Sequence, residues 1–366
     1  MKIKAMIAPG NGEAFSYSDV EIDAPRADEI FVKIEAVGMC HTDVLAQHGV
    51  FQFGRAVVLG HEGAGVVERI GRDINKVKIG DRVCLSFRSC GMCRKCQSNQ
   101  PASCQDFASL NVSGGRVDGS RALSRDGQGL ASNFFGQSSF ATHALTYEQN
   151  VVKIPEEIPF EIAAPMGCGV QTGAGAIMNS LDCEAGASLV VAGCGIVGLS
   201  AVMAGKIRGC GPIVAIEPVA ARRDLALELG ATHVIDPLAE DDLAQKLTEM
   251  FPNGVNYALD TSARADVLEV LLGTLAVKGD LGLVGIIDPN ADFKCSGAAL
   301  MAKGLSVHAI IEGDSHPDSF IPELIGYYKA GRLPLDRLIA TYPLKDINIA
   351  IKDHSAGACA KVVLIP

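Results

Sequence analysis

The sequence has 366 residues, more than one ordinary hydrophobic core holds, so about two domains are expected. Apolar residues make up 48% and charged residues 20%, a balance typical of globular rather than disordered chains. A formal net charge of −10 argues against nucleic acids and anionic membrane surfaces as partners.

No targeting or membrane segment is expected. The amino terminus has only a short apolar run before Pro9, too little for a signal peptide. Residues 188–205 approach the length of a membrane span, but three glycines interrupt them. We therefore expect a cytoplasmic location, a reducing compartment in which clustered cysteines bind metal more often than they form disulfides.

Two patterns divide the chain. Residues 1–150 contain short β-branched runs at 30–37, 65–70 and 81–85, which predict an antiparallel β domain. From about residue 160, buried strands alternate with helices, which predicts a parallel, doubly wound sheet. The strands are expected at 188–192, 212–217, 233–236, 257–260 and 282–285, with helices between them that end at 209, 230, 250 and 277.

A glycine-rich turn follows the first strand of the second region. Gly193, Gly195 and Gly198 form G-x-G-x-x-G between a strand and a helix, where a pyrophosphate can approach the backbone. Glu217 follows at the end of the next strand, where a carboxylate binds ribose hydroxyls and repels a 2′-phosphate. The pattern predicts NAD rather than NADP, although two arginines follow at 222 and 223. The alternative is a plain glycine turn.

Four cysteines are spaced C-x2-C-x2-C-x7-C: Cys90, Cys93, Cys96 and Cys104. A disulfide knot is disfavoured in a reducing compartment. Iron–sulfur runs of bacterial ferredoxins open in the same way, but they close after three residues and continue with proline. Here seven residues precede the last cysteine and Gln105 follows it, which fits four thiolates around a tetrahedral, structural zinc.

Three other segments carry metal-ligand residues: 38–43 (GMCHTD), 60–71 (GHEGAGVVERIG) and 167–169 (GCG). Cys40, His61 and Cys168 together offer two thiolates and one imidazole, a set that leaves zinc one open position. Taken singly, each has an ordinary explanation as a buried core residue. Spacing alone does not join residues that are spread over 128 positions.

These segments resemble the zinc-dependent medium-chain alcohol dehydrogenases. Residues 60–71 fit the family signature GHE-x2-G-x5-G, and the C-[HR]-[ST]-D, four-cysteine and G-C-G motifs occur in the family's order. The resemblance covers essentially the whole chain. It implies an α/β fold in which a Rossmann domain with a doubly wound parallel sheet, residues 170–310, is inserted in a GroES-like β-barrel catalytic domain. The latter comprises residues 1–169 and 311–366, with a structural-zinc lobe at 89–105.

The resemblance also implies two zinc ions per chain and NAD. Cys40, His61 and Cys168 are expected to bind the catalytic zinc, with Glu62 as an occasional ligand, and the four-cysteine cluster the structural zinc. The positions that match cofactor contacts are Thr172, Val197 and Val284 for the nicotinamide, and His41 and Lys361 for the pyrophosphate.

By the same resemblance, Asp43 is expected to orient His61. Thr42 is expected to form a hydrogen bond with the substrate oxygen and to start a proton relay. In many relatives the relay ends in a histidine three residues after this hydroxyl. Leu45 occupies that position here. The nearest substitute is His48, whose alternative is an ordinary surface role.

Within the family, residues 134–145, 167–176 and 320–336 look most like aryl- or benzyl-alcohol dehydrogenases and the related geraniol enzymes. Phe51, Phe134, Phe135 and Ile286 match pocket-lining positions, although the phenylalanines have core packing as an alternative. Aromatic walls favour a flat apolar substrate. An aromatic or allylic primary alcohol is therefore expected, oxidised or formed from its aldehyde.

Other readings of the family likeness remain. A glutathione-dependent formaldehyde dehydrogenase needs basic residues around its pocket, and a polyol dehydrogenase usually has an acid where this chain has Cys168. A catalytically silent member is a third reading, which the full set of ligands disfavours. The family likeness further implies a homo-oligomer, a dimer or tetramer, joined through edge strands of the Rossmann sheets.

Overall fold

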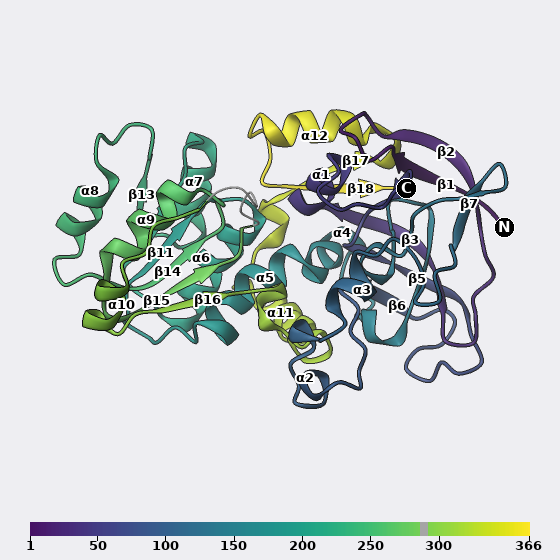
Figure 1. Ribbon diagram of the computed structural model, residues 1–366, viewed down its shortest axis with the longest axis horizontal. Helices are drawn as coiled ribbons and strands as arrows, with labels where there is room; N and C mark the ends of the chain where they lie inside the picture. The colour runs from purple at the N-terminus through teal and green to yellow at the C-terminus, as the bar shows by residue number, and fades with distance from the viewer. Residues whose placement is uncertain (286–291) are drawn as a thin grey trace. The chain divides into compact units, whose positions relative to one another are not determined.

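The computed structural model of the protein describes residues 1–285 and 292–366 and divides into two compact units (Figure 1). Unit 1 comprises Met1–Gly169, His316–Gly326 and Leu335–Pro366, and unit 2 comprises Val170–Ser315 and Tyr327–Pro334. Each unit has a hydrophobic core of its own.

Unit 1 is built on two sheets. One has the order β4 (Val57–Val58), β1 (Lys2–Ala8), β2 (Ser16–Ile22), β7 (Leu123–Arg125) and β8 (Gln128–Gly129). The other has the order β10 (Val151–Lys153), β6 (Arg82–Leu85), β5 (Gly63–Ile70), β3 (Ile30–Met39), β18 (Lys361–Ile365) and β17 (Ile339–Pro343), with β9 (His143–Thr146) also paired to β3.

The antiparallel β region expected over residues 1–150 is confirmed. The runs predicted at 30–37, 65–70 and 81–85 form the neighbouring strands β3, β5 and β6. The pair β17 and β18 is parallel, and helix α12 (Ile347–Ser355) connects the two, as a parallel pair requires a crossover. The other helices of the chain's unit 1 segments are α1 (His41–Gln47), α2 (Arg94–Gln97), α3 (Phe107–Asn111) and α4 (Phe160–Ala163), while α11 (Pro317–Lys329) contributes residues to both units.

Unit 2 contains a six-stranded parallel sheet. Its order is β13 (His233–Ile235), β12 (Ile213–Ile216), β11 (Leu189–Ala192), β14 (Val255–Asp260), β15 (Leu275–Leu283) and β16 (Ser306–Ala309). Counted within the unit this is 3-2-1-4-5-6, the order of a Rossmann sheet, which confirms the predicted fold. Strands β11 and β12 are buried throughout, as expected where helices cover both faces. The helices are α5 (Gly169–Gly175), α6 (Ile196–Arg208), α7 (Ala220–Leu229), α8 (Leu243–Met250), α9 (Ala265–Thr274) and α10 (Gly297–Lys303).

Unit 2 differs in detail from the sequence analysis. The strand expected at 282–285 spans Leu275–Leu283 as β15. The helix expected to reach residue 277 ends at Thr274, because Leu275 adopts extended backbone angles and begins β15. The apolar run there suits a helix face and a buried strand equally, so periodicity does not mark the boundary. Strand β16 was missed because it is an edge strand with mostly exposed side chains, and it shows no hydrophobic signal.

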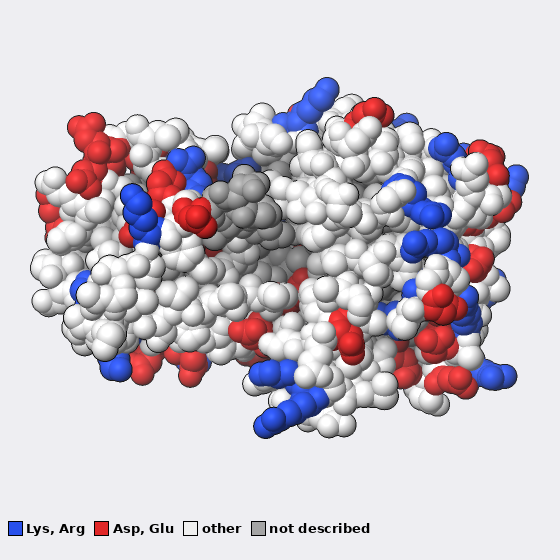
Figure 2. Space-filling model, in the orientation of Figure 1, with Lys and Arg blue, Asp and Glu red and all other residues white. Residues whose placement is uncertain are grey.

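Within the described ranges, the helices all fall short of the length and apolar character that a membrane crossing needs. On the face drawn in Figure 2, acidic and basic side chains are interspersed. The net charge is therefore not gathered in one patch of that face.

Candidate active site

Four residues with metal-binding side chains meet in unit 1, although they come from three distant segments. One candidate ligand atom from each of Cys40, His61, Glu62 and Cys168 lies within 4.8 Å of the others. Cys40 stands between β3 and α1, His61 and Glu62 directly precede β5, and Cys168 directly precedes α5. The ends of these elements, rather than sequence spacing, bring the four side chains together.

Asp43 connects two of these segments. Its Oδ1 accepts hydrogen bonds from His61 Nδ1 and from the backbone N–H of Gly60, both at 3.0 Å. Its Oδ2 accepts from the backbone N–H of Cys40, also at 3.0 Å. The carboxylate is buried, with 1% exposure. A proton on Nδ1 leaves the lone pair of the imidazole on Nε2, the tautomer that a metal ligand needs.

The inner nitrogen of His61 fits a metal site. Nε2 is buried and has no well-aligned hydrogen-bond partner within the described part of the chain, and the Cys40 sulfur is its neighbour. A hydrogen bond from Cys168 lowers the pKa of Cys40 well below its ordinary value, although burial opposes this. Two thiols, one readily deprotonated, and an imidazole with its lone pair turned inward are the donor set of a zinc site.

Glu62 is held by a buried cation. Its carboxylate forms an ion pair with Lys361 Nζ, and its Oε1 accepts from the backbone N–H of Gly169 at 3.2 Å. A Cβ at Gly38 would lie 1.8 Å from Glu62 Oε2, so only glycine leaves room for the carboxylate. Burial lowers the pKa of Lys361, but the charge of Glu62, together with the thiols of Cys40 and Cys168, outweighs this effect and the pKa is raised.

This arrangement bears on the expected contact of Lys361 with a pyrophosphate. The lysine is 1% exposed, and its Nζ also donates to the backbone oxygen of Met39 at 2.9 Å. Its charge is paired with that of Glu62. The contact between Lys361 and a pyrophosphate therefore stays a prediction, and this geometry does not support it. The ion pair itself was missed by the sequence analysis, since nothing in the spacing links positions 62 and 361.

The two residues of the expected proton relay lie at opposite ends of helix α1. The hydroxyl of Thr42, at its first turn, lies 3.6 Å from the Cys40 sulfur. His48 caps the other end, is exposed, and places its Nδ1 2.8 Å from the backbone oxygen of Val44. They are six positions apart, which corresponds to a rise of about 9 Å along the helix axis. The relay through His48 stays a prediction, and this position favours its capping role.

Aromatic rings surround His61. The ring of Phe135 stacks on the imidazole with centroids 4.6 Å apart, and Phe134 meets it edge-on at 5.5 Å. Phe51 lies 6.0 Å from Phe134 and is half-buried, whereas Phe134 is fully buried. Phe107, which the sequence analysis did not single out, packs edge-on against Phe135. Ile286, the fourth expected pocket residue, lies outside the described residues.

Gln137 supports the backbone around His61 and was also missed. Its side-chain nitrogen donates to the backbone oxygens of His61 and Ser86, at 2.9 and 3.1 Å. Its side-chain oxygen accepts from the N–H of Gly63 at 3.0 Å. The buried amide is therefore fully used, and it fixes the turn that presents the imidazole.

The four-cysteine cluster forms a separate site. The Sγ atoms of Cys93 and Cys96 are 3.5 Å apart, and those of Cys90 and Cys96 are 3.9 Å apart. Backbone N–H groups donate to two sulfurs, Cys90 to Cys104 and Cys93 to Cys90, each at 3.3 Å. Backbone N–H groups lower the pKa of Cys93 to about 6. Four converging sulfurs with such donors fit a closed zinc site.

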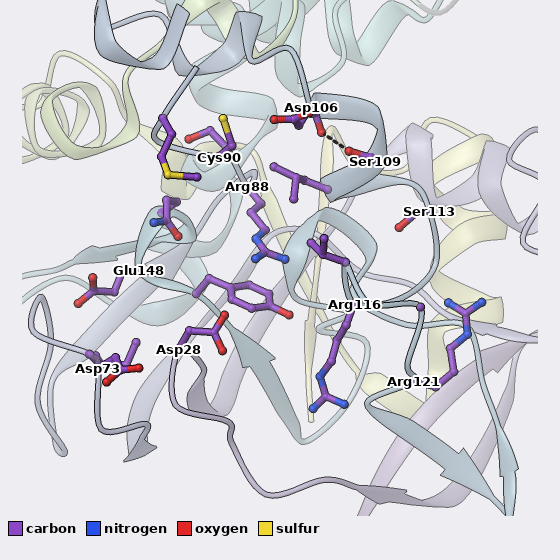
Figure 3. Close-up of a pocket in the computed structure, with 18 residues that line it drawn as sticks. Asp28, Asp73, Arg88, Cys90, Asp106, Ser109, Ser113, Arg116, Arg121 and Glu148 are labelled. Carbon is purple, nitrogen blue, oxygen red and sulfur yellow. Dashed lines mark hydrogen bonds between the residues drawn. The ribbon is translucent and has the colours of Figure 1, made fainter. Parts of the chain in front are cut away.

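A cavity of about 680 Å³ lies beside this cluster (Figure 3). Cys90 lines it, as do Arg88, which covers the ring of Tyr147, and Arg116, which is paired with Glu29. The cavity lining includes none of the four candidate metal ligands Cys40, His61, Glu62 and Cys168. The cavity is therefore separate from the candidate metal site around His61.

The glycine motif of unit 2 has the geometry of a dinucleotide-binding turn. A Cβ at Gly198 would lie 1.8 Å from the backbone oxygen of Gly193, so helix α6 packs against the turn only with glycine there. Thr172 on α5 and Val197 on α6 belong to touching segments, since a Cβ at Gly173 would meet the Val197 backbone at 2.0 Å. Val284 directly follows β15, and His41 is exposed at the start of α1.

The carboxylate of Glu217 faces this turn. It is 3% exposed, and its two oxygens accept the backbone N–H groups of Cys194, at 2.7 Å, and Val219, at 3.0 Å. Arg223 is tied to the same turn, because its guanidinium donates to the backbone oxygens of Glu217 and Pro218 and pairs with Asp236.

Two family models match the chain: the alcohol dehydrogenase GroES-like domain over residues 26–156 and the zinc-binding dehydrogenase domain over residues 197–325. Geraniol dehydrogenase from Castellaniella defragrans is 42% identical over 355 residues, which cover 97% of this chain and 95% of that protein. The crystal structure of benzyl alcohol dehydrogenase from Acinetobacter calcoaceticus is 37% identical, with a TM-score of 0.96 over 100% of this chain and 99% of that one.

A further solved structure, an alcohol dehydrogenase zinc-binding domain protein from Burkholderia ambifaria, is 41% identical with a TM-score of 0.97 over 100% and 99% of the two chains. Sequence and fold therefore agree over the full length of these proteins. The chain belongs to the zinc-dependent medium-chain alcohol dehydrogenases and is an oxidoreductase that acts on alcohols.

Proposed function

We propose that the protein oxidises an aromatic or allylic primary alcohol to the aldehyde, with hydride transfer to NAD. The observation that carries the substrate class is the group of aromatic rings around His61. Relatives named geraniol dehydrogenase and benzyl alcohol dehydrogenase support the same class. The reverse reduction is equally allowed by this machinery.

In this proposal Cys40, His61 and Cys168 hold the catalytic zinc, with Glu62 beside them. When bound, zinc acts as a Lewis acid that lowers the pKa of an alcohol hydroxyl towards neutrality. The protein's own groups do the rest. Asp43 holds the imidazole in one tautomer and orientation, and the Thr42 hydroxyl takes the proton of the alcohol. The cluster of four cysteines holds a second zinc without taking part in the reaction.

The rings give a physical basis for the substrate class. Contact between an aromatic substrate and an aromatic side chain contributes about 0.5–1.5 kcal/mol beyond the burial of apolar area. Phe51 is half-buried, so part of its ring is free to contact a substrate, while Phe134 and Phe135 hold it and His61 in place. A saturated or strongly polar substrate gains none of this contact.

The turn of unit 2 supports NAD over NADP. Each carboxylate oxygen of Glu217 has accepted one backbone hydrogen bond and keeps a lone pair for a ribose hydroxyl. Arg223, which would be the obvious partner of a 2′-phosphate, is already bound to two carbonyl oxygens and a carboxylate. The negative charge of Glu217 therefore repels the extra phosphate.

Steady-state kinetics with NAD and with NADP test the proposal. The panel contains benzyl alcohol, geraniol, cyclohexylmethanol, sorbitol and S-hydroxymethylglutathione. Benzyl alcohol and geraniol with NAD are expected to have the highest kcat/KM. Equal kcat/KM for sorbitol or for S-hydroxymethylglutathione would overturn the substrate class, and equal rates with NADP would overturn the cofactor preference.

Two variants separate the aromatic wall from the intrinsic reactivity of benzylic alcohols. Phe51→Leu is expected to lower the kcat/KM ratio of benzyl alcohol to cyclohexylmethanol by about 2- to 12-fold, the loss of one ring contact. Tyr17→Leu, at an exposed position on β2, is the matched control and should leave the ratio unchanged. If the kcat/KM ratio is unchanged in both variants, Phe51 does not contact the substrate.

The remaining proposals concern assembly and location. We propose a cytoplasmic homo-oligomer, a dimer or a tetramer, on the basis of the family likeness. Light scattering coupled to gel filtration measures the mass of the assembly directly, and a mass equal to that of one 38.3 kDa chain would overturn the proposal.

A further inference from the structure

Two cysteines flank the nucleotide-binding segment of unit 2. Cys183 precedes β11, and Cys210 follows α6 and its terminal Gly209. Between them lie the strand, the turn with the glycine motif and the helix. Neither thiol belongs to the two groups of metal-ligand residues in unit 1, and neither is in a disulfide.

The backbone holds the two cysteines together. The N–H of Gly186 donates to the oxygen of Gly209 at 2.8 Å, and the N–H of Gly211 donates to the oxygen of Ala187 at 2.9 Å. Arg208 reaches across as well, with its Nε 2.9 Å from the backbone oxygen of Cys183. The segments that carry the two cysteines thus run side by side, joined on both sides of Cys210.

The side chain of Cys210 reaches the segment that carries Cys183. Its Sγ lies 3.8 Å from the backbone oxygen of Glu184, the residue after Cys183. The two thiols are near enough that each shifts the pKa of the other. The hydrogen bonds between the two segments hold the cysteines side by side, as the formation of an S–S bond requires.

The two thiols differ in their surroundings. Cys210 is half-buried, and the neighbouring Cys183 thiol lowers its pKa, with a smaller contribution from Arg208. Cys183 is fully buried, and the neighbouring Cys210 thiol together with burial raises its pKa. A thiol of lowered pKa that solvent can reach, next to a protected thiol, is the arrangement of an attacking and a resolving cysteine.

We propose that Cys183 and Cys210 form an oxidation site at which a hydroperoxide converts the thiol pair into a disulfide. The Cys210 sulfur attacks the hydroperoxide, the O–O bond breaks, and Cys210 becomes a sulfenic acid while the other oxygen leaves with a proton as water or an alcohol. The Cys183 sulfur then attacks Cys210, the S–O bond breaks, and water leaves with the proton of Cys183. Two thiols lose two electrons and the peroxide gains them.

The cross-link encloses the segment from 183 to 210, which contains the glycine motif. It joins the entry of β11 to the exit of α6, so it restricts the unfolded chain while leaving the turn between them unaltered. Oxidation is therefore expected to raise the unfolding temperature by about 5 °C. A reductant is expected to reverse the change.

Peptide mapping of the zinc-loaded protein tests the proposal. The protein is treated with a small excess of hydrogen peroxide, its free thiols are blocked with iodoacetamide, and it is digested with trypsin. Peptide 209–222, which contains Cys210, should appear linked to peptide 154–206, with fragmentation assigning the bond to Cys183 rather than Cys168 or Cys194. Zinc is measured before and after, so that oxidation of metal ligands is recognised.

Variants complete the test. Cys210→Ser should abolish the linked peptide and the rise in unfolding temperature, and Cys183→Ala should let dimedone trap a sulfenic acid at Cys210. Cys295→Ser, at an exposed cysteine outside the pair, is the control and should behave as the unaltered protein. The proposal is overturned if both thiols of the peroxide-treated protein are alkylated, or if Cys210 is linked to any cysteine other than Cys183.

Discussion

The two cysteine-rich sites of unit 1 differ in how the chain builds them. Cys90, Cys93, Cys96 and Cys104 lie within one short lobe, and their own backbone N–H groups donate to the sulfurs. Cys40, His61 and Cys168 come from three segments, and Asp43 holds two of these segments together. A site that only stabilises a loop can be formed by residues of one segment. A metal site with a free coordination position for a substrate is instead formed by residues from distant segments that the fold brings together.

Their surroundings differ in the same sense. The cluster cysteines are partly exposed apart from Cys104, and no substrate has to reach them. His61 is enclosed by aromatic rings, and the neighbouring carboxylate of Glu62 is neutralised by Lys361. Burial of this kind strengthens electrostatic interactions, which is useful where charge develops during a reaction. Four substitutions test the division between the two sites.

The largest loss of turnover is expected from Cys40→Ser. Replacing a thiolate ligand weakens the open zinc site, and loss of its Lewis acid costs several kcal/mol of barrier, about 1,000-fold or more in kcat/KM. Zinc content should fall by one ion per chain, with little change in unfolding temperature. Full turnover with that zinc absent would place the reaction elsewhere.

Asp43→Asn is expected to have an intermediate effect. An amide of the same size fills the space but does not hold the His61 imidazole in the required tautomer, so activity or zinc affinity should fall about 10- to 100-fold. Kinetics and a zinc titration monitor the two quantities. Unchanged values in both would show that the contact between Asp43 and His61 is not needed.

Cys93→Ser should change stability instead of turnover. Metal binding to such a lobe is part of its folding free energy, so the unfolding temperature should fall by about 5 °C or more while kcat per folded protein changes less than about twofold. Calorimetry and kinetics at low temperature separate the two quantities. Loss of turnover in a fully folded protein would contradict the structural role of the cluster.

Arg116→Met removes a buried ion pair with Glu29, which stabilises the same region without a metal. Arg116 is 5% exposed, and its guanidinium donates to both oxygens of Glu29, at 2.6 and 3.0 Å. The variant therefore leaves a buried carboxylate without its counter-ion. The free energy of unfolding should fall by about 3–5 kcal/mol. Zinc content and turnover should be retained.

The matched control for this variant is Arg125→Met. Arg125 and Asp126 form an exposed pair at 3.7 Å, which should be worth less than about 1 kcal/mol. Chemical denaturation measures both variants. Equal losses of stability in the two variants would mean that burial does not determine the strength of the Arg116–Glu29 ion pair. Loss of zinc from Arg116→Met would mean that this ion pair and the four-cysteine site depend on each other.

Much of unit 2 was predictable because its signals are local. Buried strands, amphipathic helices and the glycine motif follow one another at short spacing, and their order predicts the parallel sheet. The end of α9 and the edge strand β16 were not predictable. The first lies in an apolar run that suits both structures, and the second has few buried side chains.

The candidate site was predictable in part. The family resemblance links Cys40, His61, Cys168 and Asp43, although these residues are far apart in the sequence. It did not indicate that Glu62 and Lys361 form a buried pair, that Gln137 supports the His61 turn, or that His48 caps α1. These facts depend on contacts between segments, which have no signature in local spacing.

By itself the sequence determined the elements whose physical cause is local: the strand and helix periods, the glycine turn, the acidic Glu217 and the four-cysteine lobe. Only the tertiary structure decided which distant side chains meet. Three features arise when separate elements pack: the tight packing around Gly38 and Gly198, the orientation of His61 by Asp43, and the approach of Cys210 to the segment of Cys183. Such contacts are enforced by close packing and by the need to pair buried polar groups, and both act only once the chain is folded.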